Sequence, residues 1–250
     1  MRPPVDTIYP PPFPKKASWV NVAMLRIDQQ REHPVLVEFF DVALVSSLRT
    51  LPYVQAWHER YGEAGLRVVS IHIARTELTR NEDVVRAAVE RLGITHPVLI
   101  DSTYEMWKAY DNEGLPARYV WGPVGGGHHL RDFHYGEGGY AEAERAIQAE
   151  LGVEGDLVGP LRPEDDPEAQ VVVPTAPQPG AYSGPYEAGG VWAVLSGTGT
   201  VVANGAEVAV DHPGAYPLVE HPHHTTGVLD LEVSAGVVCH EVTFTPGVAA

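Results

Sequence analysis

Pro34-Val-Leu-Val-Glu-Phe-Phe40 is an almost unbroken apolar run, and a segment with a different periodicity, Leu48–Tyr61, follows it. A short apolar run with polar flanks predicts a strand that is buried on both faces. In the second segment apolar residues recur at the spacing of one helix face, at Leu48, Leu51, Val54, Trp57 and Tyr61. Ser46 and Ser47 precede that face and are typical helix N-caps. A buried strand that leads directly into an amphipathic helix predicts an α/β architecture.

The same alternation continues along the chain to residue 151. We expect a second strand at 66–73, a helix at 81–92, a short third strand at 96–101, a helical turn at 104–110, a hairpin of strands at 117–121 and 129–134, and a last helix at 140–151. Strands and helices that alternate early and end in a hairpin predict an α/β domain with a mixed sheet.

A chain of 250 residues exceeds the usual size of one domain, and its texture changes after residue 152. Seven prolines and the acidic run Glu164-Asp165-Asp166 fall between residues 156 and 185, which favours extended and solvated backbone. The N-terminus is also rich in proline. We therefore expect an arm at 1–18, an α/β domain at 19–152, a linker at 153–180 and a second domain at 181–250.

The second domain has the pattern of an all-β fold. Short runs rich in valine and leucine predict strands at 191–195, 199–203, 206–210, 226–233 and 237–244. Asn204-Gly205 between two of them is a strong signal for a two-residue hairpin. Strands this short and this regularly spaced predict a β-sandwich or jelly roll.

Several stretches of the first domain carry a family resemblance. They are Val35-Leu-Val-Glu-Phe-Phe, Leu48-Arg-Thr-Leu-Pro-Tyr-Val, Trp57-His-Glu-Arg-Tyr-Gly, Tyr104-Glu-Met-Trp-Lys-Ala-Tyr and His134-Tyr-Gly-Glu-Gly-Gly-Tyr with Ala146-Ile-Gln. Over about residues 19–152 the chain resembles the thioredoxin-like domains of the TlpA and DipZ group. This resemblance implies a thioredoxin fold, with Pro116 at the cis-proline position of the family. From Pro185 onward the chain also looks like the β-sandwich module of DipZ-type proteins, which is likened to carbohydrate-binding domains.

The chain has a single cysteine, Cys239, so it cannot form an intramolecular disulfide, a dithiol redox centre or a thiolate zinc site. The resemblance places the Cys-X-X-Cys motif of the family at Leu44-Val45-Ser46-Ser47. Leu44 then replaces the attacking cysteine and Ser47 the resolving one, and neither side chain supplies the thiolate that exchange requires. We therefore expect no thiol–disulfide oxidoreductase activity and no catalytic residue at these positions.

Three further residues belong to the same groove by resemblance. Glu38 lies where thioredoxins keep a buried acid, His72 remains from a family motif that has otherwise changed, and Pro116 follows Leu115 where the family usually has an aromatic residue. A carboxyl group buried without a partner would have a raised pKa. Acid–base chemistry by Glu38 and His72 is therefore an alternative to the structural roles that we favour for both.

In the second domain two groups of side chains are candidate binding residues. His221, His223 and His224 could ligate a metal ion, although a proline-constrained loop explains the cluster as well. A second group could stack on sugar rings if its members were exposed on one face; it consists of Tyr182, Tyr186, Trp192 and Tyr216. We expect Trp192, however, to pack in the core. We expect neither a metal nor a cofactor.

The net charge of −16 excludes nucleic acid as a natural partner, because a phosphate backbone would be repelled. Residues 1–150 carry 20 acidic and 16 basic side chains, whereas residues 151–250 carry 13 acidic and one basic, Arg162. Such acidity permits neutral sugars or basic protein segments as partners. No apolar run approaches the ~18–20 residues of a membrane helix, and the N-terminus lacks the apolar core of a signal peptide. We therefore expect no membrane insertion and a cytoplasmic location.

These observations predict a redox-inactive thioredoxin-fold protein that binds a protein segment or a neutral carbohydrate, through the former active-site groove and the β-sandwich. The alternative is an enzyme with replaced chemistry, either a histidine–metal site in the second domain or acid–base work by Glu38 and His72. A structural subunit whose groove is covered in an oligomer is a third possibility.

Overall fold

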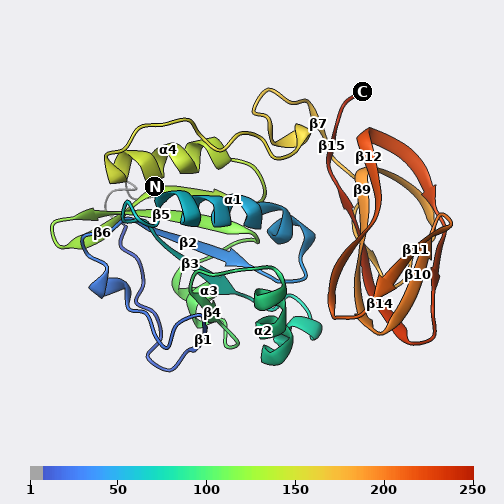
Figure 1. Cartoon of the computed structure of the whole chain (residues 1–250), viewed down its shortest axis with the longest axis horizontal. Helices are drawn as coiled ribbons and strands as arrows, with labels where there is room; N and C mark the ends of the chain where they lie inside the picture. Colours follow the sequence, from blue (N-terminus) through green and yellow to red (C-terminus); the bar gives the residue numbers. More distant parts are fainter. Residues whose placement is uncertain (1–7) are drawn as a thin grey trace. The chain divides into compact units, whose positions relative to one another are not determined.

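A computed structural model describes residues 8–250 (Figure 1). The described chain divides into two compact units, of which the first comprises residues 8–42 and 46–158 and the second comprises residues 43–45 and 159–250. The first unit contains a six-stranded mixed sheet in the order β1-β4-β3-β2-β5-β6. Its strands are β1 (Ser18–Val20), β2 (Val35–Phe40), β3 (Arg67–His72), β4 (Val98–Ile100), β5 (Ala117–Val124) and β6 (Gly127–Tyr135). Strands β2, β3 and β4 are parallel, and the other neighbours pair antiparallel. The predicted fold class is thus confirmed, and β1 is a strand that the sequence did not reveal.

Four helices cover the two faces of this sheet. They are α1 (Val45–Tyr61), α2 (Glu82–Arg91), α3 (Glu105–Ala109) and α4 (Tyr140–Leu151), with 3-10 turns at Ile27–Gln29 and Leu78–Arg80. Successive side chains of a strand point to opposite faces. Leu36 of β2 therefore packs with α1 and α4, whereas Phe39 packs on the other face with Met106 of α3. Both faces are covered, which explains why β2 has no exposed residue.

Local signals explain several helix ends. The side chain of Asn81 accepts a hydrogen bond from the backbone N–H of Asp83, as its N-cap position predicts. Gly152 follows α4 with a φ of +63°, the left-handed conformation that a glycine adopts without a steric penalty. Helix α4 is held to α1 by the buried carboxylate of Glu144, which accepts from the Tyr61 hydroxyl at 2.6 Å.

Parts of the predicted arm and of the predicted linker pack on folded units. Residues 1–7 lie outside the described part of the chain. Within residues 8–18, Phe13 is buried and meets Trp19 edge to face at 5.6 Å, so the arm packs on the first unit because it carries an aromatic anchor. Val153 and Val158 pack against the core beneath α1 and α4, so the first unit extends beyond residue 152.

The second unit is strand-rich, as predicted. It contains a 3-10 turn (Pro163–Asp165) and the strands β7 (Val171–Val172), β8 (Gln178–Pro179), β9 (Gly184–Gly197), β10 (Gly199–Ala203), β11 (Ala206–Val210), β12 (Gly214–Leu229), β13 (Leu231–Val233), β14 (Val237–Thr245) and β15 (Gly247–Val248). They form sheets of order β12-β9-β14-β8, β11-β10-β13 and β15-β7. Strands β7 and β8 lie in the predicted linker, so part of that segment belongs to the second unit.

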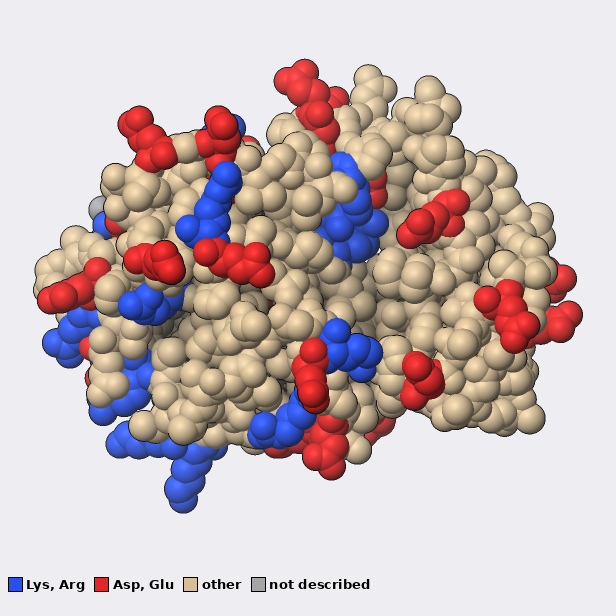
Figure 2. Space-filling view, viewed as in Figure 1, with Lys and Arg blue, Asp and Glu red and all other residues tan. Residues whose placement is uncertain are grey.

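One hydrophobic core joins the two larger sheets of this unit. It includes Val191 and Leu195 of β9, Val201 of β10, Leu218 of β12 and Phe244 of β14. Residues 163–250 contain no lysine or arginine, and Figure 2 shows acidic side chains without basic ones over these strands. The acidic side chains of these strands are therefore not balanced by any lysine or arginine within residues 163–250.

Gly189 of β9 is expected to be essential for the second unit. A Cβ atom there would lie 2.3 Å from the carbonyl oxygen of Pro246 and 2.8 Å from the Cα of Gly247, and both are backbone atoms that cannot move aside cheaply. Gly189→Ala should therefore destabilise the second unit by about 1–3 kcal/mol. Hydrogen exchange should accelerate at amides of β9, β12 and β14.

Gly159→Ala is the matched control, because its Cβ would meet open space and the residue does not have a left-handed φ. It should leave exchange unchanged in both units. Unchanged protection of β9 in the Gly189→Ala protein would contradict the close approach of the two chain segments.

Candidate functional site

The register of the sheet brings the predicted site residues of the first unit to one edge. Phe40 pairs with His72, His72 pairs with Ile100, and Phe39 pairs with Ala117. The carboxyl ends of β2, β3 and β4 therefore meet the beginning of β5. We call this the site edge, and define it as the residues that follow β2, β3 and β4 and precede β5. In open α/β sheets, ligands bind outside such strand ends.

Helix α1 begins at the site edge, close after β2. Its first turn contains Ser46 and Ser47, because the helix starts at Val45. The two serines were expected to cap the helix from outside, and that expectation is wrong. Ser47 is buried and its hydroxyl oxygen accepts a hydrogen bond from the backbone N–H of Asp41 at 3.2 Å. Ser47 thus ties the loop after β2 to the helix, and none of its hydrogen-bond partners among residues 8–250 is a base.

The carboxylate of Asp41 organises the neighbouring loop. Its Oδ2 accepts from the backbone N–H of Arg75 at 2.7 Å and from the Thr79 hydroxyl at 2.8 Å. These bonds join the segment after β3 to the end of β2. The peptide bond from Leu115 to Pro116 is cis and lies at the same edge, directly before β5. The cis conformation that the resemblance implied for Pro116 is therefore present.

A row of buried polar side chains crosses the sheet beneath α1. Glu38 of β2 stands opposite Ser70 of β3 on one side and Arg118 of β5 on the other. The Ser70 hydroxyl donates to Glu38 Oε2 at 2.8 Å and also lies 2.8 Å from Nε2 of His96. Because a hydroxyl has one proton, Nε2 of His96 must donate to Ser70 whenever Ser70 donates to Glu38. We call Arg118, Glu38, Ser70 and His96 the polar row.

Burial controls the ionisation of Glu38. The side chain is completely buried, and this desolvation raises its pKa from 4.5 to about 7 against the opposing effects of the Ser70 hydrogen bond and the Arg118 charge. Its Oε1 has no hydrogen-bond partner among the described residues. Glu38 is therefore a group that exchanges a proton near neutrality, as expected for a poorly compensated buried carboxyl.

Arg118 is held by ring faces and a carbonyl group rather than by a carboxylate. Its guanidinium lies 4.7 Å from the ring centre of Tyr140 and 5.9 Å from that of Trp57. Nη2 donates to the carbonyl oxygen of Gly138. Cation–π contacts of this kind stabilise a desolvated guanidinium. Arg118 thus lowers the pKa of Glu38 through its charge without a direct ion pair between the two side chains.

The histidines of the first unit fall into different environments. Burial lowers the pKa of His96 to about 3 and that of His72 to about 4. His134 is partly exposed, and its Nε2 lies 2.9 Å from the carbonyl oxygen of Glu137, which is a structural contact. No hydrogen bond joins Glu38 and His72 in the described structure. The two residues of the acid–base alternative are therefore not directly coupled.

The candidate residues of the second unit do not form a common site. Tyr186 and Tyr216 are buried in its core, and Tyr182 packs edge to face on Phe244 at 6.1 Å. Trp192 is half-buried and lies outside the core cluster, unlike the expectation for it. These rings therefore do not form one exposed platform.

The histidine cluster lies in the irregular stretch of β12 between Glu220 and Thr225. His221 Nε2 is 2.9 Å from the Tyr186 hydroxyl, and His223 is exposed. Within residues 8–250, no three His, Cys, Asp or Glu side chains gather as a metal ion would require. The lone thiol, Cys239, has its pKa raised by burial to about 11, which disfavours a reactive thiolate.

Ser70, His96 and Arg118 are members of the site that were not predicted from the sequence. A signal was present, because Glu38, Ser70 and Arg118 are polar interruptions in runs that are otherwise apolar. Their alignment into one row depends on the strand order and register, which the sequence pattern does not determine.

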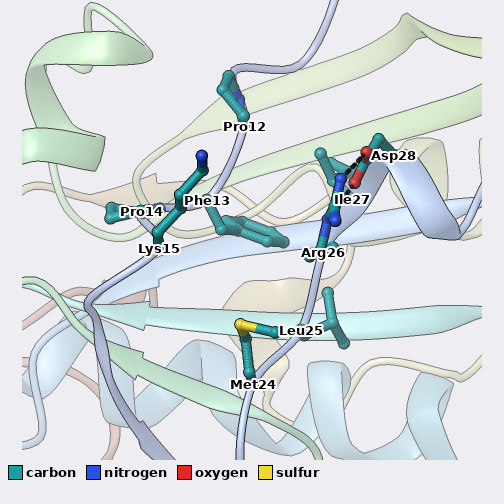
Figure 3. Close-up of a pocket in the computed structure, with 9 residues that line it drawn as sticks. All are labelled: Pro12, Phe13, Pro14, Lys15, Met24, Leu25, Arg26, Ile27 and Asp28. Carbon is teal, nitrogen blue, oxygen red and sulfur yellow. Dashed lines mark hydrogen bonds and ion pairs between the residues drawn. The ribbon is translucent and has the colours of Figure 1, made fainter.

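A pocket lies on the first unit away from the polar row (Figure 3). It has a volume of about 370 Å³ between the segments Pro12–Lys15 and Met24–Asp28, with the aromatic ring of Phe13 on its wall. Arg26 and Asp28 form an exposed ion pair at its side. Pairs of this kind contribute little to binding or stability. The pocket is mainly apolar and carries no group of the polar row.

Comparison with known proteins supports the fold. No family model matches the chain. DipZ of Mycobacterium tuberculosis is 26% identical over 133 residues, which cover 52% of this chain and 19% of DipZ. The thiol-disulfide oxidoreductase YkuV of Bacillus subtilis is 26% identical over 141 residues, which cover 56% of this chain and 93% of YkuV. The matched region is thus a fifth of DipZ but nearly all of YkuV.

Solved structures share the fold of the first unit. A crystal structure of a thioredoxin-like superfamily protein aligns with a TM-score of 0.53 at 19% identity, covering 60% of this chain and all of that one. A thiol-disulfide isomerase from Corynebacterium glutamicum aligns with a TM-score of 0.50 at 19% identity, covering 58% and 97%. The chain therefore contains a thioredoxin-like domain. Over this domain the chain is similar to thioredoxin-like proteins of the DipZ and YkuV kind.

None of the helices in residues 8–250 has the length and apolarity that a membrane span requires.

The raised pKa of Glu38 predicts a pH-dependent stability. From about pH 4.5 to about pH 7 the unfolded carboxyl is ionised while the folded one is still protonated, so stability falls as the pH rises through this window. The difference between the two pKa values corresponds to about 3 kcal/mol at full ionisation. Glu38→Gln removes this dependence but can still accept from Ser70. Its free energy of unfolding, measured by urea denaturation, should rise relative to wild type by about 3 kcal/mol between pH 4.5 and pH 8.

His72 and His96 act with the opposite sign, because their lowered folded pKa values remove stability as the pH falls below about 6.5. Both proteins retain these histidines, so their effect cancels in the difference. Glu59→Gln, at an exposed position of α1, is the matched control and should follow the wild-type curve. A constant difference between Glu38→Gln and wild type across this range would show that Glu38 is ionised in the fold well below pH 7.

Proposed function

We propose that this protein is a redox-inactive binding protein whose first unit holds an extended protein segment at the site edge. The observation that carries the proposal is the combination at this edge of a thioredoxin-like scaffold with no thiol. Residues 1–158 contain no cysteine, and Leu44 and Ser47 flank the start of α1 where the family resemblance places the reactive pair. Relatives such as YkuV bear the name of thiol-disulfide oxidoreductases, so loss of the thiols separates this chain from that chemistry.

Free backbone groups supply a means of binding. Leu115 precedes β5 at the site edge and is half-buried. Its N–H and C=O have no hydrogen-bond partner within residues 8–250, whereas the carbonyl oxygen of Pro116 already accepts from Gly136 at 2.7 Å. An extended segment can pair with such groups as an added strand does, through main-chain hydrogen bonds. Leu115 also offers apolar contact where an aromatic residue is usual in the family.

The other expected functions have less support. Glu38 is wholly buried beneath α1, so a substrate does not reach its carboxyl group, and it is not bonded to His72. A neutral carbohydrate would need exposed ring faces, but Tyr186 and Tyr216 are buried in the second unit. A protein segment at the site edge is therefore the partner that we propose.

The scaffold should regain redox chemistry when two thiols are restored. Leu44→Cys/Ser47→Cys places a pair of thiols at the start of α1, where the helix dipole lowers the pKa of a cysteine. This double variant should reduce insulin disulfides in the presence of dithiothreitol well above background. Wild type and the single variant Ser47→Cys, which lacks the attacking thiol, should stay at background. Turnover by the wild-type protein would contradict the proposed inactivity.

Binding at the site edge should protect the Leu115 amide. Peptides selected from a displayed random library on the immobilised wild-type protein should slow hydrogen exchange of this amide by about tenfold or more when bound. Leu115→Asp should weaken the same peptides, while Glu113→Gln, at an exposed neighbour, should bind them as wild type does. Selected peptides that leave exchange at Leu115 unchanged would place binding elsewhere and overturn the proposed groove.

A further inference from the structure

The pocket between Pro12–Lys15 and Met24–Asp28 is large enough for a small molecule (Figure 3). Its volume of about 370 Å³ lies within the ~300–1,000 Å³ that ligand pockets usually have. It exceeds the ~30 Å³ share of one water molecule many times over. Its lining contains no residue of the site edge or of the polar row. The pocket is therefore a separate candidate site of the first unit.

The hydrophobic core of the first unit forms the floor of this pocket. Phe13 and Ile27 are buried members of that core, and Leu25 is half-buried against it. Figure 3 shows the ring of Phe13 extending from its own segment toward Met24–Asp28. Because core packing holds these side chains, a ligand meets an apolar surface that exists before binding. Preformed surfaces of this kind reduce the entropy cost of association.

Met24 adds an exposed apolar side chain to the wall. It is 58% exposed, and Pro12 and Pro14 contribute apolar surface on the other segment. A methionine side chain is flexible and polarizable, so it adapts to the shape of an apolar ligand. A hydrocarbon group in the pocket would shield these side chains from water, which is the main source of affinity at such a site.

The charged groups of the lining favour a ligand with one negative charge. Arg26 and Asp28 neutralise each other in an ion pair. Lys15 is exposed and has no ion pair or hydrogen bond within residues 8–250. The lining therefore carries one positive charge that no lining residue balances. A carboxylate can approach Lys15 without displacing an existing partner.

These two features together select the class of ligand. An anion without an apolar part would gain only an exposed ion pair with Lys15, which contributes little. An apolar molecule without a charge would leave Lys15 unpaired, and a cation would be repelled by it. A hydrocarbon group that carries a single carboxylate uses both the apolar floor and the lysine.

We propose that this pocket binds a small apolar carboxylic acid in its ionised form. The hydrocarbon part lies against Phe13, Met24 and Ile27, and the carboxylate pairs with Lys15. This inference goes beyond the proposed binding of a protein segment and does not depend on it, because no residue of the pocket belongs to the site edge. Either proposal can therefore fail without the other.

Hexanoate is a suitable probe, with hexanamide as its neutral isostere and hexylammonium as its cationic counterpart. In protein labelled with ¹³C at isoleucine methyl groups, hexanoate should shift the Ile27 methyl resonance in a saturable manner, with a dissociation constant in the millimolar range for so small a molecule. The methyl of Ile147, which is buried in a different core cluster, should stay unchanged. Hexanamide should bind about twofold to fivefold more weakly, and hexylammonium more weakly still. A shift of Ile27 that never saturates, or equal affinity for all three probes, would overturn the proposal.

The role of Lys15 is tested by removing its charge. Lys15→Gln should bind hexanoate and hexanamide with equal affinity, because the carboxylate has lost its partner. Lys16→Gln removes the same charge at the exposed neighbour that does not line the pocket, and it should keep the preference for hexanoate. A preference that survives in Lys15→Gln would contradict the proposed ion pair.

The location of the ligand is tested at Met24. Met24→Glu replaces an apolar wall with a negative charge and should abolish the response of Ile27 to hexanoate. Gln29→Glu adds the same charge at an exposed position outside the lining, and this matched control should retain the response. Saturable binding of hexanoate by Met24→Glu with wild-type affinity would place the ligand outside this pocket and contradict the inference.

Discussion

The buried carboxyl of Glu38 is the constraint on which the first unit depends. It lies at the centre of the sheet, beneath α1, where ionisation is opposed by burial and helped by one hydroxyl and one distant guanidinium. The residues around it follow from this need: Ser70 donates to it, Arg118 supplies positive charge, and His96 completes the hydrogen bonding of Ser70. Replacing any one of these residues with alanine or leucine would remove a hydrogen bond or a charge on which another buried polar group of the row depends.

The polar row lies beneath a site edge at which Leu44 and Ser47 occupy the positions that the family resemblance assigns to the reactive cysteines. In the resemblance that the sequence carries, the buried acid serves a resolving thiol, and here Ser47 stands in that position with its hydroxyl bonded to the backbone of Asp41. In the structure the row joins β2, β3 and β5 beneath α1. At the same edge, the backbone N–H and C=O of Leu115 have no hydrogen-bond partner within residues 8–250, and His72 is buried with both ring nitrogens unpaired among the described residues.

The sequence predicted the strands and helices of the first unit because their apolar periodicities are strong, and α4 has the predicted bounds. It missed β1, which has three residues, and the first half of β12, where Pro217, Pro222 and the histidines hide the alternation. Leu44, Ser47, Glu38, His72 and Pro116 were recognised through family resemblance. Ser70, His96 and Arg118 were not, because only the register of β2 with β3 and β5 aligns them. The pocket lined by His72, Thr79 and Asp101 was not predicted either, because it forms only when the turn Leu78–Arg80 packs beside the ends of β3 and β4.

The ionisation of Glu38 in the folded protein is the decisive test of the buried polar row. Carbon-13 NMR of the side-chain carboxyl, assigned by comparison with Glu38→Gln, follows the titration in the intact protein. We expect a midpoint near pH 7, with the resonances of Ser70 and His96 changing over the same range. A midpoint near the ordinary value of 4.5 would mean that water or a positive charge reaches the carboxylate, and the polar row would not be the closed, buried structure described above.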